Sequence, residues 1–200
     1  MLAIAGGKGG SGKTTTTVGI AQAVERAVVA VDADRDMPNL HSMVGVERGD
    51  EAFPEAKPHP TESSVSILPA PRGTDDEAFE RWLRAIAEDE VPAVVDCPAG
   101  AGPDAAVPLR VADGVVIVTQ LCAPALRDAA KTAAMARAVG TPVVGAVVSR
   151  SRIAPSALGD LIDAPVLGAV PEGQSPVLSD ANVRGAYKRI VGAIRPEGLI

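Results

Sequence analysis

Short apolar runs alternate with longer segments of helical periodicity along the whole of this 200-residue chain. The runs are apolar at nearly every position, which is typical of parallel strands buried on both faces of a sheet. They predict seven strands, at about residues 2–6, 28–32, 65–68, 93–96, 114–119, 143–148 and 166–170. Helices are expected after Thr14 and over residues 75–89, 125–139 and 180–194. The alternation predicts a single α/β domain, with a mostly parallel sheet of about seven strands and helices on both faces.

The helix expected at 75–89 has a start signal and one apolar face. Residues 74–77 read TDDE, which matches a capping box with Thr74 as its first residue and Glu77 as its last. The positions that follow place four large side chains on one side of the helix, namely Phe79, Trp82, Leu83 and Ile86. We therefore expect this face to pack against the sheet.

The last helix has an apolar stripe and a basic one. The apolar stripe comprises Val183, Tyr187, Ile190 and Ile194, and the basic side chains largely opposite are Arg184, Lys188 and Arg195. A basic amphipathic helix can bind a membrane or nucleic acid, but a terminal helix packed on the sheet has the same pattern, and we favour packing. We do not expect residues 195–200, which are few and include Pro196 and Gly198, to form a separate C-terminal membrane anchor.

Residues 46–64 depart from the alternating pattern. They include Pro54, Pro58 and Pro60 with five acidic residues and little periodicity. We expect an irregular Pro-rich surface loop inside one domain that spans residues 1–200, because nothing else marks a domain boundary.

Composition and charge exclude several classes of protein. Aromatic residues make up 2% of the chain, too few for a surface that stacks nucleic-acid bases, and a net charge of −6 argues against a surface that coats DNA. Nucleic acid is therefore not expected as a partner. No signal peptide or membrane span is visible, so we expect a cytoplasmic protein, with peripheral membrane or polar placement left open.

One glycine-rich segment matches the P-loop pattern GxxxxGK[ST], directly after the first apolar run and at the start of a helix. It consists of Gly7, Lys8, Gly9, Gly10, Ser11, Gly12, Lys13 and Thr14, and Thr15 follows it. In such a loop, successive backbone N–H groups and the helix N-terminus surround phosphates. Lys13 is then expected to neutralise the β- and γ-phosphates, and the Thr14 hydroxyl to bind Mg²⁺. The fold prediction becomes a P-loop NTPase domain.

Three carboxylates follow apolar runs and complete the expected site. Asp96 ends the run at 93–96, and Asp32 and Asp34 stand at the end of the run at 28–32. Ligands of open α/β sheets bind at the carboxyl ends of strands, so the three acids are expected to converge near the P-loop. Asp96 is the expected Mg²⁺ carboxylate.

These motifs resemble the MinD/ParA family of P-loop ATPases, and the MinD branch most closely. The extra Lys8 in the P-loop resembles the family's deviant Walker A motif, and the segments DAD at 32–34 and PNL at 38–40 resemble switch I. DCPAG at 96–100 is similar to the Walker B and switch II segment, and LRDA at 126–129 and VPE at 170–172 also match in order. The resemblance covers nearly the whole chain.

The resemblance implies a Mg²⁺- and ATP-dependent switch that dimerises face to face around two nucleotides. Lys8 would reach the phosphates held by the partner subunit, and Asp34 would orient the attacking water. Asp32 and Asp96 would support Mg²⁺ and the switch geometry. The adenine would lie beside Ser149, Arg150, Pro171 and Glu172. Such switches control the position or assembly of a cellular structure through a regulatory or cargo protein, which the sequence does not identify.

Two other functions stay open at this stage. The wider superfamily includes carriers of metals or iron–sulfur clusters, for which Cys97 and Cys122 are the available thiols, although a structural role is favoured because their spacing makes no paired site. A nucleotide-binding adaptor without hydrolysis is disfavoured because Lys8, Lys13 and Asp34 are all present. His41 and His59 are lone histidines in loop-like sequence, and we assign them no ligand or base role.

Overall fold

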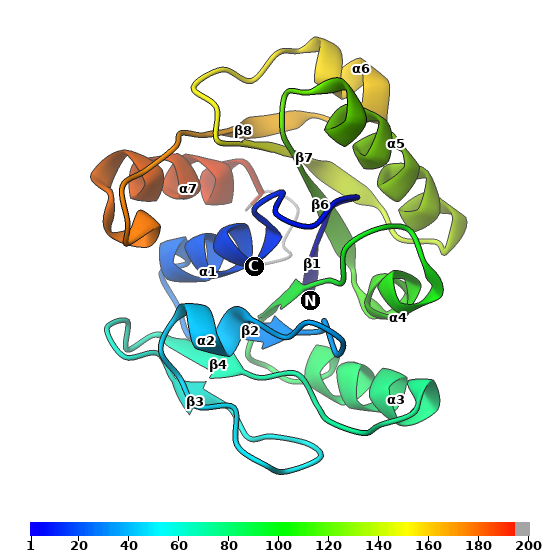
Figure 1. The fold of residues 1–200 in the computed structure, drawn as a ribbon, viewed down its shortest axis with the longest axis vertical. Coiled ribbons are helices and arrows are strands. Elements are labelled where there is room, and N and C mark those ends of the chain that lie inside the picture. The colour runs from blue at the N-terminus through cyan, green and yellow to red at the C-terminus, as the bar shows by residue number, and fades with distance from the viewer. Residues whose placement is uncertain (195–200) are drawn as a thin grey trace.

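The apolar runs form one sheet in the computed structural model, which describes residues 1–194 (Figure 1). The strand order is β3-β4-β2-β5-β1-β6-β7-β8, and all neighbours are parallel except β3 and β4. The strands are β1 (Leu2–Ala5), β2 (Val28–Asp32), β3 (Lys57–Pro58), β4 (Val65–Leu68), β5 (Ala93–Asp96), β6 (Gly114–Thr119), β7 (Val143–Ser149) and β8 (Val166–Val170). The α/β prediction with a mostly parallel sheet is confirmed.

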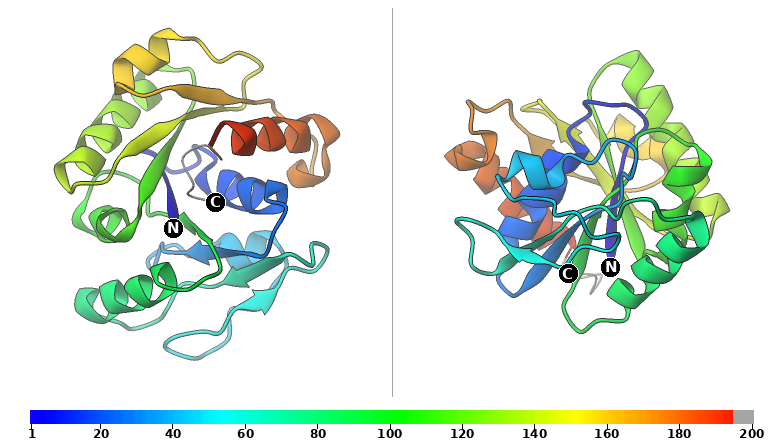
Figure 2. Two further views of the ribbon diagram at one scale, coloured as in Figure 1. Left: turned by 180° about the vertical axis from the view of Figure 1, so that it is seen from behind. Right: turned by 60° about the horizontal axis from the view of Figure 1, so that its bottom comes forward.

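Helices cover both faces of the sheet. They are α1 (Lys13–Ala23), α2 (Leu40–Met43), α3 (Asp76–Ala87), α4 (Pro103–Val111), α5 (Ala123–Ala138), α6 (Ala157–Ile162) and α7 (Ala181–Ile194), with a 3₁₀ turn at Val177–Ser179. Figure 1 shows α1 and α7 on one side of the sheet and α3, α4, α5 and α6 on the other, and the reverse view in Figure 2 shows the same layers.

The seven predicted strands become eight because of a short strand inside the segment expected to be irregular. Lys57 and Pro58 form β3, which pairs antiparallel with β4 through Ile67 and Ser66. Two residues cannot display the alternating pattern that reveals a strand, so no sequence signal marked it.

Helices α2, α4 and α6 were also not predicted. α2 has four residues and α6 has six, which is too short for a repeated apolar face. α4 begins at Pro103 and contains Pro108, and glycines precede it. The composition around α4 is therefore typical of a loop, although proline is well tolerated in the first turn of a helix.

Alternate side chains of each central strand belong to opposite layers of the core. In β1, Leu2 and Ile4 pack toward α1 and α7, whereas Ala3 and Ala5 pack on the other side, with α3, α4 and α5. Small side chains allow close helix packing there: α5 buries Ala129, Ala133 and Ala136. A core poor in aromatic residues is thus filled by short aliphatic side chains on both faces.

The predicted capping box at α3 is wrong by one residue. Asp75, not Thr74, is the N-cap, and its Oδ1 accepts a hydrogen bond of 2.7 Å from the backbone N–H of Ala78. Glu77 pairs with Arg81 one turn later instead of closing a box. The predicted apolar face is confirmed, because Phe79 and Leu83 are buried and Trp82 and Ile86 pack beside them.

The last helix packs on the sheet as favoured. All four residues of its apolar stripe are buried, and Arg184 and Lys188 are exposed. The predicted tail at 195–200, with Arg195, lies outside the residues that the structure describes. Within residues 1–194, no helix combines the length and the apolar character needed to cross a membrane.

Candidate nucleotide-binding site

The strand order brings the three candidate segments to one edge of the sheet. β5 lies between β1 and β2, so the P-loop after β1 and the loops after β5 and β2 are neighbours. Asp96 pairs in register with Ile4 on one side and with Asp32 on the other. Two carboxylates and the P-loop therefore meet at the carboxyl ends of three adjacent strands, where open α/β sheets bind ligands.

Glycine conformation shapes the P-loop. Gly10 and Gly12 have φ values of 77° and 95°, in the left-handed region that other residues avoid. Gly12 is the N-cap of α1, and no side chain caps the first N–H groups of this helix. Those N–H groups remain available to an anion at the positive end of the helix.

Two side chains from neighbouring strands brace the P-loop. Ser149 Oγ lies 2.6 Å from the carbonyl oxygen of Ser11, and Gln120 Nε2 donates a hydrogen bond of 3.1 Å to the carbonyl oxygen of Gly10. Gly7 approaches α5 so closely that an added Cβ would lie 2.3 Å from Asp128 Cβ. Contacts with the rest of the fold therefore fix the position of the P-loop.

Three oxygen atoms converge at the start of α1. Thr14 Oγ1 lies 2.5 Å from Asp96 Oδ2, to which it donates, and 2.9 Å from Asn39 Oδ1. The other carboxylate oxygen, Asp96 Oδ1, is buried without a hydrogen-bond partner. Hydroxyl, carboxylate and amide oxygens are the ligands that Mg²⁺ prefers, and the unpartnered Asp96 Oδ1 has unused acceptor capacity. This donor set fits Mg²⁺.

The protein alone does not complete a metal site here. Among residues 1–194, no group of three or more His, Cys, Asp or Glu side chains is placed to hold a metal ion. Mg²⁺ at Thr14 and Asp96 would therefore need further ligands from phosphate oxygens and water, which is how Mg²⁺ binds in nucleotide enzymes.

Burial dominates the electrostatics of the paired aspartates. It raises the pKa of Asp96 to about 7, and Asp32 adds to this rise, while the Thr14 hydroxyl and Lys13 oppose it. Burial also raises the pKa of Asp32 to about 6, against the effect of the backbone N–H groups that it accepts. A divalent cation would favour the ionised form of Asp96.

Asp32 organises the loop that follows β2. Its carboxylate oxygens accept backbone N–H groups from Asp34, Asn39 and Leu40 at 3.0–3.1 Å. Asp34 Oδ1 in turn accepts the N–H of Met37 at 3.0 Å. Asp32 is thus a buried support of the loop, and Asp34 lies farther out, half-buried.

A cavity of about 480 Å³ opens beside the P-loop. Its walls come from the P-loop, from the loop after β2 and from the segment after β5. They comprise Gly9, Gly10, Gly12, Lys13, Thr14, Thr15, Asp34, Met37, Asn39, Ser42, Met43, Asp96, Cys97, Ala99 and Arg150.

A second cavity of about 230 Å³ shares Gly12, Thr15 and Arg150 with the first. The four residues expected beside a base, Ser149, Arg150, Pro171 and Glu172, all line it, together with Val170, Gly173, Val177 and Tyr187. Arg150 joins the two cavities from a strained backbone position, with φ 51°. The two cavities are therefore adjacent, and all four residues predicted beside the base lie in the second one.

Some expected site residues do not line either cavity. Gly7 packs against Asp128, Ser11 and Asp32 are buried, and Lys8 is exposed. None of the ion pairs formed within residues 1–194 involves Lys8.

Sequence reasoning missed several residues of the site. Asn39 stands in a recognised motif but was not chosen as a site residue, and only its distance to Thr14 reveals it. No sequence pattern marked Gln120 as a site residue, because it is 110 positions along the chain from Gly10, to which it donates.

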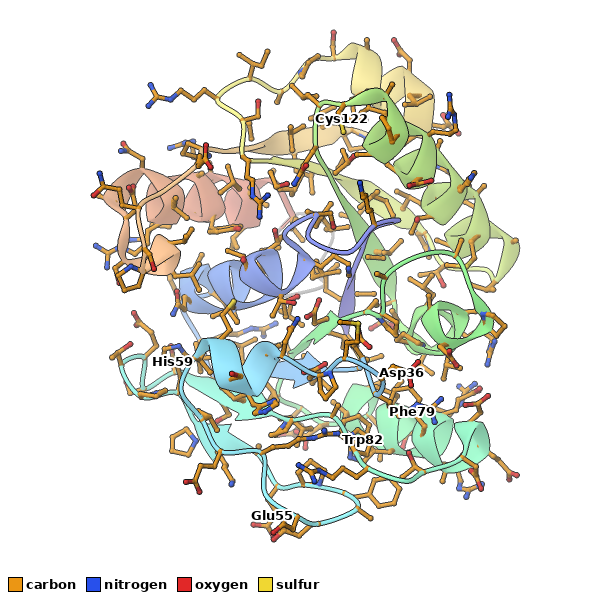
Figure 3. The ribbon with its side chains drawn as sticks, viewed as in Figure 1. Asp36, Glu55, His59, Phe79, Trp82 and Cys122 are labelled. Carbon is orange, nitrogen blue, oxygen red and sulfur yellow. The ribbon has the colours of Figure 1, made fainter. Side chains whose placement is uncertain are left out.

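The two cysteines have different environments. Cys97 is completely buried, and burial raises the pKa of its thiol well above the usual range. Cys122 is exposed at the N-cap of α5 (Figure 3). Cys97 behaves as a small core residue, because a buried thiol with a raised pKa is a poor metal ligand.

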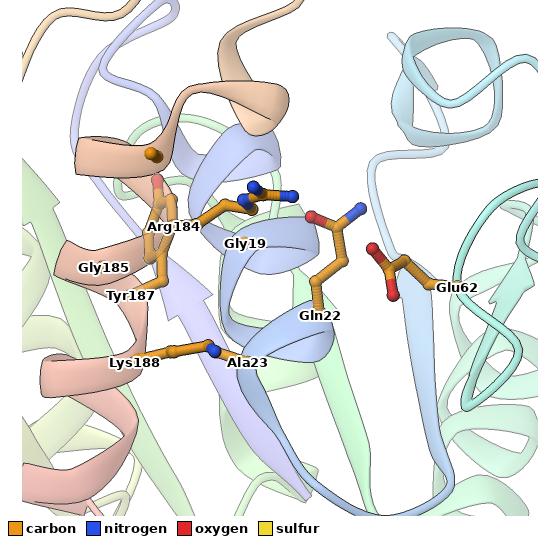
Figure 4. Close-up of a pocket in the computed structure, with 9 residues that line it drawn as sticks. Gly19, Gln22, Ala23, Glu62, Arg184, Gly185, Tyr187 and Lys188 are labelled. Atoms are coloured by element: carbon orange, nitrogen blue, oxygen red, sulfur yellow. The ribbon is translucent and has the colours of Figure 1, made fainter.

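A separate groove of about 460 Å³ runs between α1 and α7 (Figure 4). Arg184 and Lys188 line it from α7, Gln22 from α1, and Glu62 from the loop before β4. Tyr187 also lines it and forms a hydrogen bond of 3.3 Å with Thr16. The groove shares no residue with the larger cavity at the P-loop.

The chain is similar to known nucleotide-binding proteins over most of its length. The model of the CobQ/CobB/MinD/ParA nucleotide binding domain matches residues 2–182. An uncharacterised ATP-binding protein of Methanocaldococcus jannaschii is 31% identical over 194 residues, covering 86% of this chain and 74% of its own. The septum site-determining protein MinD of Synechocystis is 26% identical, covering 90% of this chain and 78% of its own.

Solved structures share the fold. MinD of Pyrococcus horikoshii, complexed with Mg-ADP, superposes with a TM-score of 0.82 at 24% identity, over 98% of this chain and 96% of that one. MinD in the MinC:MinD complex of Aquifex aeolicus gives 0.77 at 22% identity, over 98% and 95% of the two chains.

Proposed function

This chain belongs to the CobQ/CobB/MinD/ParA nucleotide-binding domain family, and on that premise we propose that it is a Mg²⁺-dependent ATPase switch that dimerises around bound ATP. Family members of this type are P-loop ATPases, and one relative of the same fold is complexed with Mg-ADP. The single observation that carries the proposal is the convergence of Thr14, Asp96 and Asn39 at the P-loop cavity.

The phosphates would bind where the free N–H groups of α1 and the Lys13 side chain meet. Lys13 is the first residue of α1 and is largely buried in the cavity wall, at 8% exposure. A buried ammonium beside helix N–H groups attracts a multiply charged anion more strongly than an exposed one. Thr14 and Asp96 would hold Mg²⁺, which would neutralise charge on the β- and γ-phosphates.

Hydrolysis needs an oriented water at the far side of the γ-phosphate. The water oxygen bonds to the γ-phosphorus, the bond to the bridging oxygen breaks, ADP leaves with that oxygen, and the proton of the water passes to the solvent or the released phosphate. Asp34 lines the same cavity as the P-loop, on a loop fixed by Asp32. We assign Asp34 the role of holding the water by a hydrogen bond.

The adenine would occupy the second cavity. Ser149 supports the P-loop with its hydroxyl, so base contacts fall to the side chain of Arg150, the Pro171 ring and the Glu172 region. An arginine or a proline ring can cover a base face without reading its edge.

Lys8 supports the dimer part of the proposal. Lys13 already occupies the lysine position of the P-loop, and Lys8 is exposed and lines neither cavity. An exposed lysine beside a phosphate site can reach the phosphates of a second subunit facing it. Such a dimer would couple assembly to the nucleotide and control the position or assembly of a cellular structure through a regulatory or cargo protein.

Phosphate release by the pure protein tests the reaction. The parent should turn over ATP slowly with Mg²⁺ and not with EDTA. Asp34→Ala should still bind Mg-ATP in calorimetry but release at least about tenfold less phosphate, because a water-orienting carboxylate acts in the transition state. Lys13→Ala should lose tight binding altogether.

The same experiment separates the alternatives. Tight ATP binding by the parent without phosphate release would leave a nucleotide-binding adaptor. Unchanged turnover in Asp34→Ala would remove this residue from the reaction.

A further inference from the structure

The loop that carries Asp34 is also held from outside, by the next residue. The Arg35 guanidinium donates to the carbonyl oxygen of Thr74 at 2.8 Å through Nη1, and it pairs with Asp76 through Nη2. Thr74 directly precedes the N-cap of α3, and Asp76 is the first residue of this helix. Arg35 therefore connects the loop after β2 to the start of α3.

A third and a fourth contact complete the setting of Arg35. Its Cζ lies 4.5 Å from the centre of the buried Phe79 ring, and Phe79 stacks on Trp82 at 5.8 Å between ring centres. Nη2 also lies 3.7 Å from Asp104 Oδ1. Figure 3 shows Phe79 and Trp82 together below Asp36, the residue that follows in the loop.

Asp104 links this cluster to the opposite wall of the cavity. It lies in the first turn of α4, directly after the segment that begins at Asp96 and contributes Cys97 and Ala99 to the cavity. Arg35 therefore connects two walls of the cavity. It directly follows Asp34 in the loop after β2, and it pairs with Asp104 of α4, the helix that follows the segment after β5.

The Arg35 side chain is only 18% exposed, which is low for an ion pair at the surface. A planar guanidinium can lie flat on a ring while its fixed fork donates to oxygens in the ring's plane, and the compact ammonium of lysine cannot reproduce that combination. The set of contacts is therefore suited to arginine, and it connects the loop to α3 and α4.

We propose that Arg35 is a positioning residue that holds the Asp34 loop against α3 and α4, so that Asp34 stays over the P-loop cavity. Asp32 fixes the same loop from the inside through backbone N–H groups, and Arg35 fixes it from the outside. The inference rests on the proposed ATPase function, because the position of the loop would affect hydrolysis through Asp34.

The test compares Arg35→Lys with a matched control. Arg110→Lys is the control, since Arg110 pairs with Glu80 between the same two helices, α4 and α3, without touching the loop. Arg35→Lys should lower kcat for ATP hydrolysis about tenfold or more and change KM less than about threefold, because a displaced group costs rate and not ground-state affinity. Arg110→Lys should change neither.

A second comparison, made in the Asp34→Ala variant, tests whether Arg35 positions Asp34 or only stabilises the fold. If Arg35 acts through Asp34, adding Arg35→Lys to Asp34→Ala should cause no further loss of kcat. An equal further loss in that background, or a lowered melting temperature with unchanged kcat, would overturn the inference.

Fluorescence gives a readout that does not depend on hydrolysis. Trp82 is the only tryptophan in the chain, and it stacks on the ring that Arg35 covers. Arg35→Lys should shift its emission or raise its quenching by acrylamide, and Arg110→Lys should not. If the parent fails to hydrolyse ATP, the proposed function fails, while unchanged Trp82 emission in Arg35→Lys would reject the contact itself.

Discussion

At the scale of single residues, the site is defined by two aspartates that pair across adjacent strands. Asp32 and Asp96 are in register on β2 and β5, and both are nearly inaccessible to solvent. Neighbouring carboxylates in a buried place destabilise each other's charge, so the ligand-free protein keeps them at a cost to stability. A cation beside Asp96 would compensate this charge. Binding sites often contain buried charges of this kind, which destabilise the protein until the ligand binds.

The pH dependence of stability follows from these shifts. Burial raises the pKa of Asp96 to about 7, whereas an unfolded aspartate titrates near 3.9. Between these values the folded chain binds more protons than the unfolded one, so this carboxylate makes the fold less stable as the pH rises from about 4 to about 7.

Asp96→Asn should therefore stabilise the nucleotide-free protein at pH 8 by roughly 2–4 kcal/mol and have little effect at pH 4. Urea unfolding in EDTA at several pH values measures the difference between variant and parent. Asp160→Asn, an exposed position on α6, is the control for the loss of one carboxylate. A difference that stays constant from pH 4 to pH 8 would contradict the assigned pKa.

At the scale of elements, the packing of α1 on α7 positions the P-loop helix. Gly19 of α1 faces the Tyr187 ring, and a Cβ there would lie 2.2 Å from Cε2 of the tyrosine. Tyr187 is buried, and it also lines the second cavity. A shift of this ring would thus disturb both the helix pair and the expected base site.

We expect Gly19→Ala to destabilise the fold by about 2–3 kcal/mol, since overpacking forces the ring or the helix to move. Gly192→Ala is the matched control within α7, because an added Cβ there meets no atom within 4 Å. It should be neutral or stabilise by up to about 1 kcal/mol, as alanine has the higher helix propensity. Chemical unfolding of the two variants measures both effects, and equal effects would show that the contact with Tyr187 does not matter.

At the scale of the whole molecule, the decisive question is whether two subunits meet at the P-loop face. Lys8 is exposed there and makes no ion pair within residues 1–194. Two nucleotides facing each other would bring many phosphate charges into a poorly hydrated interface, which needs compensating cations.

In the Asp34→Ala background, which should hold ATP without hydrolysing it, light scattering with Mg-ATP should give a dimer. Adding Lys8→Ala should return it to the monomer with ATP affinity within about threefold, because Lys13 and Thr14 remain. Lys188→Ala, with the same loss of charge on α7, should stay dimeric. A dimer that persists without Lys8 would reject the proposed role of this lysine.

The local sequence was sufficient for the elements whose pattern repeats along the chain. The P-loop, the central strands and the apolar faces of α3 and α7 follow from residue spacing, because burial on one or both sides requires that spacing. It was insufficient for the two-residue strand β3 and for the short helices α2, α4 and α6. It also placed the cap of α3 on Thr74, because two possible capping residues stand side by side.

The sequence by itself determined which residues could bind a phosphate and where strands ended in carboxylates, since these depend on neighbours along the chain. Only the tertiary structure decided what lies across the site: β5 between β1 and β2, Asn39 beside Thr14, Gln120 against Gly10, and Arg35 on Phe79. These contacts join residues 25 to 110 positions apart. Strand order and helix packing set them, and neither is encoded in a local pattern, because both depend on how the whole chain buries its apolar surface.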